Sequence, residues 1–179
     1  VRPENVMPGE GIDGLLGLLV RLMIAPGDRV VTSDGAYPTF NYHVAGFGGV
    51  LEKVPYRDDA EDPQALARAA HQTGARLVYL ANPDNPMGSW HPGHRIRAML
   101  DNLPEPGLLV LDEAYAEFAP DDAIPRIDPN DDRAIRLRTF SKAYGMAGAR
   151  IGYAIGAAPL IASSSSFRSI LAMWRKSGQ

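Results

Sequence analysis

One lysine in this sequence stands where covalent chemistry could take place. Lys142 lies in the stretch RTFSKAYGMAGAR, residues 138–150, between strand-like runs at 134–137 and 151–155. A lysine amine can form an imine with an aldehyde, and the hydroxyls of Thr139 and Ser141 together with Arg150 could hold a phosphate beside it. On this stretch alone, a solvated surface lysine that follows a strand stays open as the alternative.

Two further motifs also follow strand-like runs. The sequence NPDNPMG, residues 82–88, comes directly after the run at 76–80, and its Asn-Pro turns are unusually dense for a simple connection. Residues 108–111 form a continuous apolar run, typical of a strand covered on both faces, and Asp112 follows at its end. A buried carboxylate is costly unless it is paired, so Asp112 has either a functional partner or a structural role as a cap or ion-pair partner.

A glycine-rich turn near the start of the sequence offers a place for an anion. The turn, GEGIDG at residues 9–14, leads into a helical pattern from about Asp13 to Met23 that Pro26 and Gly27 end. Free backbone N–H groups at such a helix start can bind an anion, although the segment could also be only a turn. The aromatic residues from Tyr37 onward could be plain core or could cover a flat ring.

Strand-like runs alternate with helical patterns along most of the chain. Strands are expected at 29–32, 50–55, 76–80, 108–111 and 134–137, and helices are expected to begin near residues 63 and 94. This alternation predicts a right-handed βαβ array around a largely parallel sheet. Ligands bind to such sheets at the carboxyl ends of the strands, so Asn85, Asp112 and Lys142 are predicted to meet at one edge.

Composition limits the possible partners. The chain has 179 residues, enough for one domain with a sizeable core, and its net charge of −3 gives no case for nucleic acid or an anionic membrane. No cysteine is present, which excludes disulfides and thiolate metal sites. The absence of a signal peptide and of a long apolar span favours a cytoplasmic protein.

Two clusters of polar residues are expected to have no role in a functional site. His91 and His94 lie three residues apart, but no carboxylate is patterned with them, and we expect no metal site. The acidic run DDAED, residues 58–62, is expected to be a solvated loop that leads into a helix at Pro63.

Taken together, the motifs resemble those of the fold-type I, class I/II aminotransferases, which use pyridoxal 5′-phosphate, and most closely the histidinol-phosphate aminotransferase branch. RPENV at 2–6, NPDNPMG, DEAY at 112–115 and TFSKAYGMAGAR occur in the family's order and spacing, and the resemblance covers about residues 2–156. It implies an α/β fold in which residues 1–156 form a three-layer α/β/α large domain with a mainly parallel sheet. Residues 157–179 would be a C-terminal helical tail, and we expect the chain to be truncated at both ends, without the family's small domain.

The resemblance also implies a role for each site residue. Lys142 would bind the cofactor aldehyde as an imine and move the substrate proton, Asp112 would pair with the pyridinium nitrogen, and Asn85 and Tyr115 would donate to the ring oxygen. Thr139, Ser141, Arg150 and the backbone amides of Ile12 and Asp13 would hold the phosphate, and Tyr37 would stack on the ring. Ile12, Gly14 and Met87 depart from the family pattern without removing a principal role.

The implied reaction is transamination between an amino acid, or a histidinol-phosphate-like amine, and a 2-oxo acid. A homodimer is expected if a full-length form exists. Two alternatives stay open: a decarboxylase or lyase, because the cofactor site does not fix which Cα bond breaks, and a non-catalytic or weakly active cofactor-binding fragment. The family's small domain carries the arginine that grips the substrate carboxylate, so a chain without it is expected to react slowly or not at all.

Overall fold

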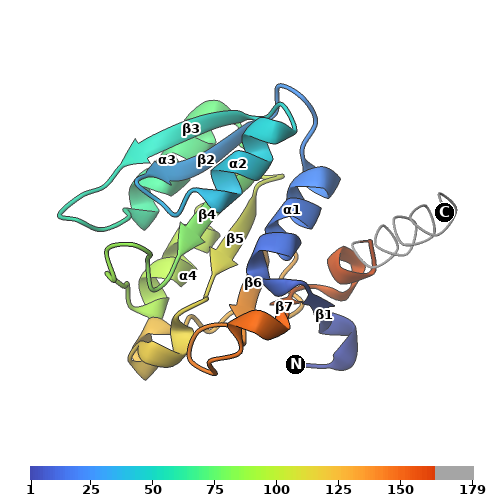
Figure 1. The fold of residues 1–179 in the computed structure, drawn as a ribbon. Helices are drawn as coiled ribbons and strands as arrows, with labels where there is room; N and C mark the ends of the chain where they lie inside the picture. The colour runs from blue at the N-terminus through green and yellow to red at the C-terminus, as the bar shows by residue number, and fades with distance from the viewer. Residues whose placement is uncertain (164–179) are drawn as a thin grey trace, which may run out of the picture.

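The computed structural model describes residues 1–163, so most of the predicted helical tail at 157–179 lies outside the described residues. The described residues form one seven-stranded sheet in the order β1-β7-β6-β5-β4-β2-β3 (Figure 1). Its strands are β1 (Val6–Gly9), β2 (Arg29–Asp34), β3 (Val50–Pro55), β4 (Leu77–Ala81), β5 (Leu108–Asp112), β6 (Ala134–Thr139) and β7 (Gly152–Ile155).

Most neighbouring strands run parallel. The pairs from β3 through β2, β4 and β5 to β6 are parallel, and β7 is antiparallel to both β6 and β1. The prediction of a mainly parallel sheet is therefore confirmed. The single reversed strand brings the segment after β6 back across the sheet edge, which places the end of that segment beside the start of the first helix.

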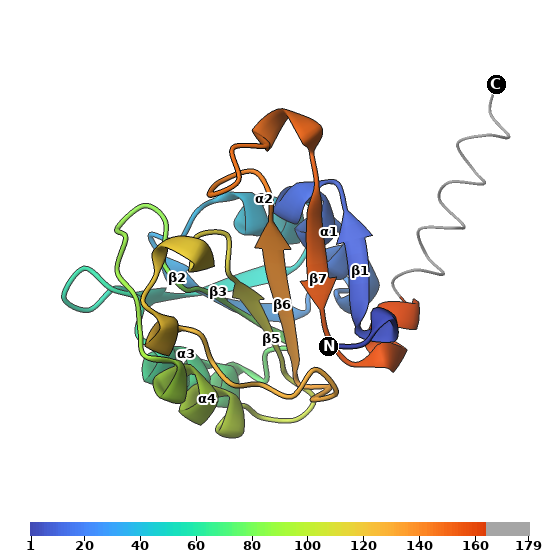
Figure 2. The same cartoon turned by 90° about the horizontal axis from the view of Figure 1, so that it is seen from below.

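Helices cover both faces of the sheet, which gives three layers. Helices α1 (Gly11–Met23) and α2 (Thr39–Gly46) share one apolar core with one face of the sheet. Helices α3 (Pro63–Thr73) and α4 (Gly93–Asp101) share a second core with the opposite face. Figure 2 shows the two helical layers on either side of the strands. The predicted α/β/α architecture is confirmed.

The central strands β4 and β5 are buried along their whole length, and successive side chains enter opposite cores. In β4, Tyr79 belongs to the core shared with α1 and α2, and Leu80 belongs to the core shared with α3 and α4. This period of two is a property of extended backbone. At the end of β5 it turns Asp112 toward the α1 side and Glu113 toward the other.

The structure differs from the expectation in three places. The opening segment forms strand β1, although Pro8 and Gly9 make it a poor strand former, because it pairs with β7. The aromatic segment after Tyr37 forms helix α2, which no helical period of its apolar residues indicates. The prediction of a solvated acidic loop at 58–62 holds for Asp58 and Asp59 but is wrong for Glu61, which is 2% exposed.

Glu61 is buried because its carboxyl group accepts hydrogen bonds from two neighbouring strands. Its Oε1 accepts from the N–H of Ala81 at 3.0 Å and its Oε2 accepts from the hydroxyl of Ser33 at 2.5 Å. The next residue, Asp62, caps α3 by accepting from the N–H groups of Gln64 and Ala65.

No helix within residues 1–163 is both long and apolar enough to cross a membrane.

A buried carboxylate joins β5 to β6 on the face away from α1. Glu113 is 0% exposed and accepts hydrogen bonds from the guanidinium groups of Arg136 and Arg138, each with a contact at 2.8 Å. Arg138 also donates to Glu117 at 2.9 Å. Because these groups are largely shielded from water, the pairing is costly to break from one side only.

Removal of the Glu113 carboxylate should destabilise the fold strongly. In Glu113→Ala two guanidinium groups lose their shared acceptor, and breaking a buried pair in this way costs about 3–5 kcal/mol. Urea unfolding should show that loss in the free energy of unfolding. The matched control is Asp101→Ala, which removes the carboxylate of exposed pairs with Arg97 and Arg133 and should cost less than about 1 kcal/mol. Equal costs for the two variants would contradict this account.

Candidate functional site

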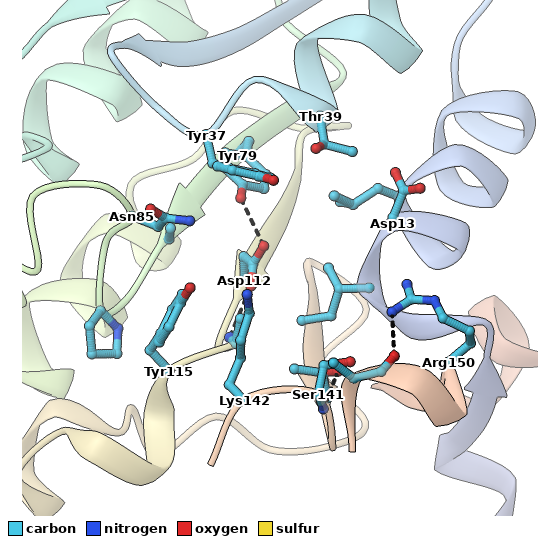
Figure 3. A pocket seen from close by; sticks show the side chains of 17 residues that line it. Asp13, Tyr37, Thr39, Tyr79, Asn85, Asp112, Tyr115, Ser141, Lys142 and Arg150 are labelled. Atoms are coloured by element: carbon cyan, nitrogen blue, oxygen red, sulfur yellow. Dashed lines mark hydrogen bonds between the residues drawn. The ribbon is translucent and has the colours of Figure 1, made fainter. Parts of the chain in front are cut away.

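A cavity of about 370 Å³ opens at the carboxyl ends of β4, β5 and β6, on the α1 side of the sheet. Every residue that the sequence predicts for the site lines it: Ile12, Asp13, Tyr37, Asn85, Asp112, Tyr115, Thr139, Ser141, Lys142 and Arg150. Figure 3 shows these side chains converging from segments far apart in the chain. The predicted convergence at one sheet edge is therefore what the fold produces.

Asp112 lies at the inner wall of the cavity and is 8% exposed. Its Oδ2 accepts from the Tyr79 hydroxyl at 2.8 Å, and its Oδ1 accepts from the N–H of Ala114 at 2.9 Å. Burial raises the pKa of the Asp112 carboxyl, while these two hydrogen bonds and the nearby charge of Lys142 act in the opposite direction. The carboxylate is thus paired, as its position after an apolar strand requires.

Lys142 stands on the loop that follows β6. Its Nζ lies 5.2 Å from the centre of the Tyr115 ring, and Figure 3 shows the side chain directed toward Asp112. A hydrogen bond fixes the start of this loop: the hydroxyl of Thr139, the last residue of β6, accepts from the N–H of Ser141 at 3.1 Å. A primary amine and a buried carboxylate therefore face the same space.

The start of α1 and the end of the lysine loop form a cationic cradle. Gly11 has φ of 71°, and a Cβ built there would lie 2.7 Å from Nη2 of Arg150. Only glycine therefore lets the guanidinium approach the first turn of the helix so closely. The unpaired N–H groups of a helix start and an arginine side chain both favour an anion.

The turn after β4 is fixed by Asn82 and carries Asn85 to the cavity. The Asn82 amide donates to the carbonyl oxygens of His91 and Ala123, and its Oδ1 accepts from the N–H of His91. The ring of His91 is also occupied, because its Nε2 lies 2.6 Å from the carbonyl oxygen of Glu61. The histidine belongs to this internal network.

Sequence reasoning missed several residues of the cavity wall, above all Tyr79. The others are Leu16, Thr39, Ala81, Pro83, Ala114 and Ala147. The one available signal for Tyr79 was its position two residues before the end of a buried strand, which places its side chain on the same face as the site. A tyrosine in an apolar run reads equally well as plain core.

Comparison with known proteins gives a consistent match. The family model described as aminotransferase class I and II matches residues 1–178. The solved structure of histidinol-phosphate aminotransferase from Sinorhizobium meliloti in complex with pyridoxal 5′-phosphate is 56% identical with a TM-score of 0.88, over 94% of this chain and 46% of that one. The histidinol-phosphate aminotransferase of Halorubrum lacusprofundi is 43% identical over 162 residues, 87% of this chain and 43% of that protein.

A more distant relative has the same name and a similar extent of match. The histidinol-phosphate aminotransferase of Bacillus cytotoxicus is 34% identical over 164 residues, 90% of this chain and 44% of that protein. The chain thus spans somewhat less than half the length of the proteins it matches.

Glu61 should make stability depend on pH. Burial raises the pKa of its carboxyl from 4.5 to about 8. The folded state then keeps a proton that the unfolded chain releases, so this contribution is complete below about pH 4.5 and is lost as the pH rises to about 8. The free energy of unfolding in urea should fall across that window, and it should fall less in Glu61→Gln. The exposed control Glu105→Gln should retain the wild-type slope, and a Glu61→Gln slope equal to it would contradict the assignment.

Proposed function

Because the chain belongs to the class I and II aminotransferase family, we propose that its cavity binds pyridoxal 5′-phosphate and serves transamination in the full-length protein. The observation that carries this proposal is the presence of three groups in one cavity: the amine of Lys142, the buried carboxylate of Asp112 and the cradle of Arg150 and Gly11. An aldehyde, a basic ring nitrogen and a phosphate are the three complementary groups of this cofactor.

The residues present fit that cofactor. Because Gly11 has no Cβ, the Arg150 guanidinium can lie against the helix start, and two hydroxyls, of Thr139 and Ser141, line the cavity with Arg150. The backbone amides of Ile12 and Asp13 at the helix start would complete the phosphate site. Tyr37, which lines the cavity and is 49% exposed, would cover the ring. When bound, the cofactor supplies an electron sink for bonds at the substrate Cα.

The protein's own groups would bind, orient and move protons. The Asp112 carboxylate would hold the ring nitrogen in its protonated form, since an anion at hydrogen-bonding distance favours the cation. Asn85 and Tyr115 would donate to the ring oxygen. The Lys142 amine would bind the cofactor aldehyde and afterwards take up and return the Cα proton of the substrate at Nζ.

The substrates are inferred from the relatives. The name of the Sinorhizobium protein, at 56% identity, supports a histidinol-phosphate-like amine as one substrate. We infer a 2-oxo acid as the amino acceptor from the chemistry of transamination. We also propose that residues 1–156 form a large domain followed by a tail. Two such chains would pair as a homodimer in the full-length protein.

Borohydride reduction should fix the cofactor on Lys142. The sequence has three lysines, Lys53, Lys142 and Lys176, so mass spectrometry of the reduced, digested protein can assign the label without ambiguity. We expect the label on Lys142 and its loss in Lys142→Arg, which keeps the charge but cannot bind the aldehyde in this way. Label on another lysine, or none on the wild type, would refute the cofactor assignment.

Asp112→Asn should bind the cofactor and react slowly. The amide keeps the shape of the carboxylate but loses its charge, and loss of one preorganised electrostatic contact costs roughly 10²–10³ in rate. The measurement is the single-turnover half-reaction of the full-length protein with a panel of amino acids and histidinol phosphate. Asp101→Asn, on the exposed face of α4, is the control. Cofactor binding without any half-reaction in the wild type would refute transamination while leaving the binding site in place.

A further inference from the structure

Tyr79 carries a hydroxyl at a buried position where packing needs only an aromatic ring. It lies in the middle of β4, is 1% exposed, and its strand neighbours Val78 and Leu80 are apolar. A phenylalanine would fill the same space without a hydroxyl that needs a hydrogen-bond partner. The partner in this structure is the Asp112 carboxylate, at 2.8 Å from Oη to Oδ2.

The position of that hydroxyl is fixed from both sides. The Tyr79 ring stacks on Phe40 of α2 with ring centres 4.7 Å apart and planes 15° apart, and Phe40 is 0% exposed. In the sheet, Tyr79 pairs with Val110 and Ala81 pairs with Asp112, so the tyrosine and the aspartate project from the same face of neighbouring strands. Figure 3 shows the hydroxyl directed at the carboxylate. Close packing leaves the phenol no other orientation.

Asp112 needs help to stay ionised in these surroundings. Burial disfavours its charge, and Glu113 on the next position of the chain adds like-charge repulsion. Glu61 interacts electrostatically with Asp112, but burial raises the pKa of Glu61 to about 8, so its carboxyl adds little negative charge beside Asp112 below that pH. Lys142 and the two hydrogen-bond donors act in the opposite direction, and the Tyr79 hydroxyl is the larger of the two hydrogen-bond contributions.

We propose that Tyr79 is a positioning residue of the cofactor site, whose hydroxyl orients the Asp112 carboxylate and keeps it anionic toward the cofactor ring. The backbone N–H of Ala114 holds Oδ1 and the phenol holds Oδ2, which restrains the rotation of a carboxylate that lines the cavity. The inference rests on the proposed function for the identity of the ligand. The effect of Tyr79 on Asp112 is a property of the chain itself.

The first test measures Asp112 directly. In the full chain labelled with ¹³C-aspartate, the carboxyl resonance of Asp112, assigned by its loss in Asp112→Asn, is titrated without ligand. Tyr79→Phe keeps the ring stacked on Phe40 and removes one donor, so the titration midpoint should rise by about one pH unit. The matched control is Tyr42→Phe, since Tyr42 is 72% exposed on α2 and does not line the cavity. An unchanged midpoint in Tyr79→Phe would overturn the proposal.

The second test measures binding of pyridoxal 5′-phosphate by absorbance titration at several pH values. Tyr79→Phe should weaken binding roughly tenfold, the size expected for one hydrogen bond to a charged group, and should move the acidic limb of binding to higher pH. If Tyr79 acts through the charge of Asp112, the substitution should have little effect in the Asp112→Asn background. Equal losses in both backgrounds would mean that the tyrosine only supports packing, which would refute the proposed role.

The two tests separate this inference from the proposed function. A wild-type protein that does not bind pyridoxal 5′-phosphate at any pH would refute the proposed function. Binding by the wild type together with an unshifted Asp112 titration in Tyr79→Phe would instead refute the role of Tyr79 and leave the cofactor assignment intact.

Discussion

Two consecutive carboxylates, Asp112 and Glu113, stand at the end of the buried strand β5, and the structure around them must provide partners for both. Extended backbone sends Asp112 and Glu113 to opposite faces of the sheet, so each needs its own partners inside the protein. Glu113 is neutralised by Arg136 and Arg138 of the neighbouring strand. Within residues 1–163, Asp112 accepts hydrogen bonds from two neutral donors and has Lys142 as its nearby cation. One face of the sheet edge is therefore closed by ion pairs, and the other keeps a carboxylate available to a ligand.

The sheet order brings the remaining groups to that carboxylate. Strand β5 lies between β4 and β6, so the segments that follow these three strands meet at one edge. The reversed strand β7 then places Arg150 against the first turn of α1, a contact between residues far apart in the sequence. The order of the strands in the sheet, rather than local sequence, thus brings together the two parts of the cationic cradle. The local requirement is the glycine at position 11, which lets Arg150 approach.

The sequence predicted what depends on local patterns and missed what depends on contacts at a distance. Asp112 and Lys142 could be assigned to a site because each follows a strand-like run and has chemistry that a simple turn does not need. Tyr79 could not be distinguished from core, because its hydroxyl acquires meaning only once β4 and β5 are paired in register. Glu61 lies in an acidic run that is solvated at its start, and only the meeting of β2 and β4 buries it. Strand β1 likewise exists only through its pairing with β7.

The distribution of charge along the cavity determines how a ligand can lie in it. Asp112 occupies the inner wall, and because burial disfavours the charge of its carboxyl, a cationic partner that stabilises this charge is favoured there. At the α1 side, Arg150 and the helix start favour negative charge. A ligand with a protonated ring nitrogen at one end and a phosphate at the other satisfies both ends in a single orientation, and the reverse orientation would place like charges together. Lys142 lies between these two ends, beside Tyr115, where its amine would be available to a substituent on the ring of such a ligand.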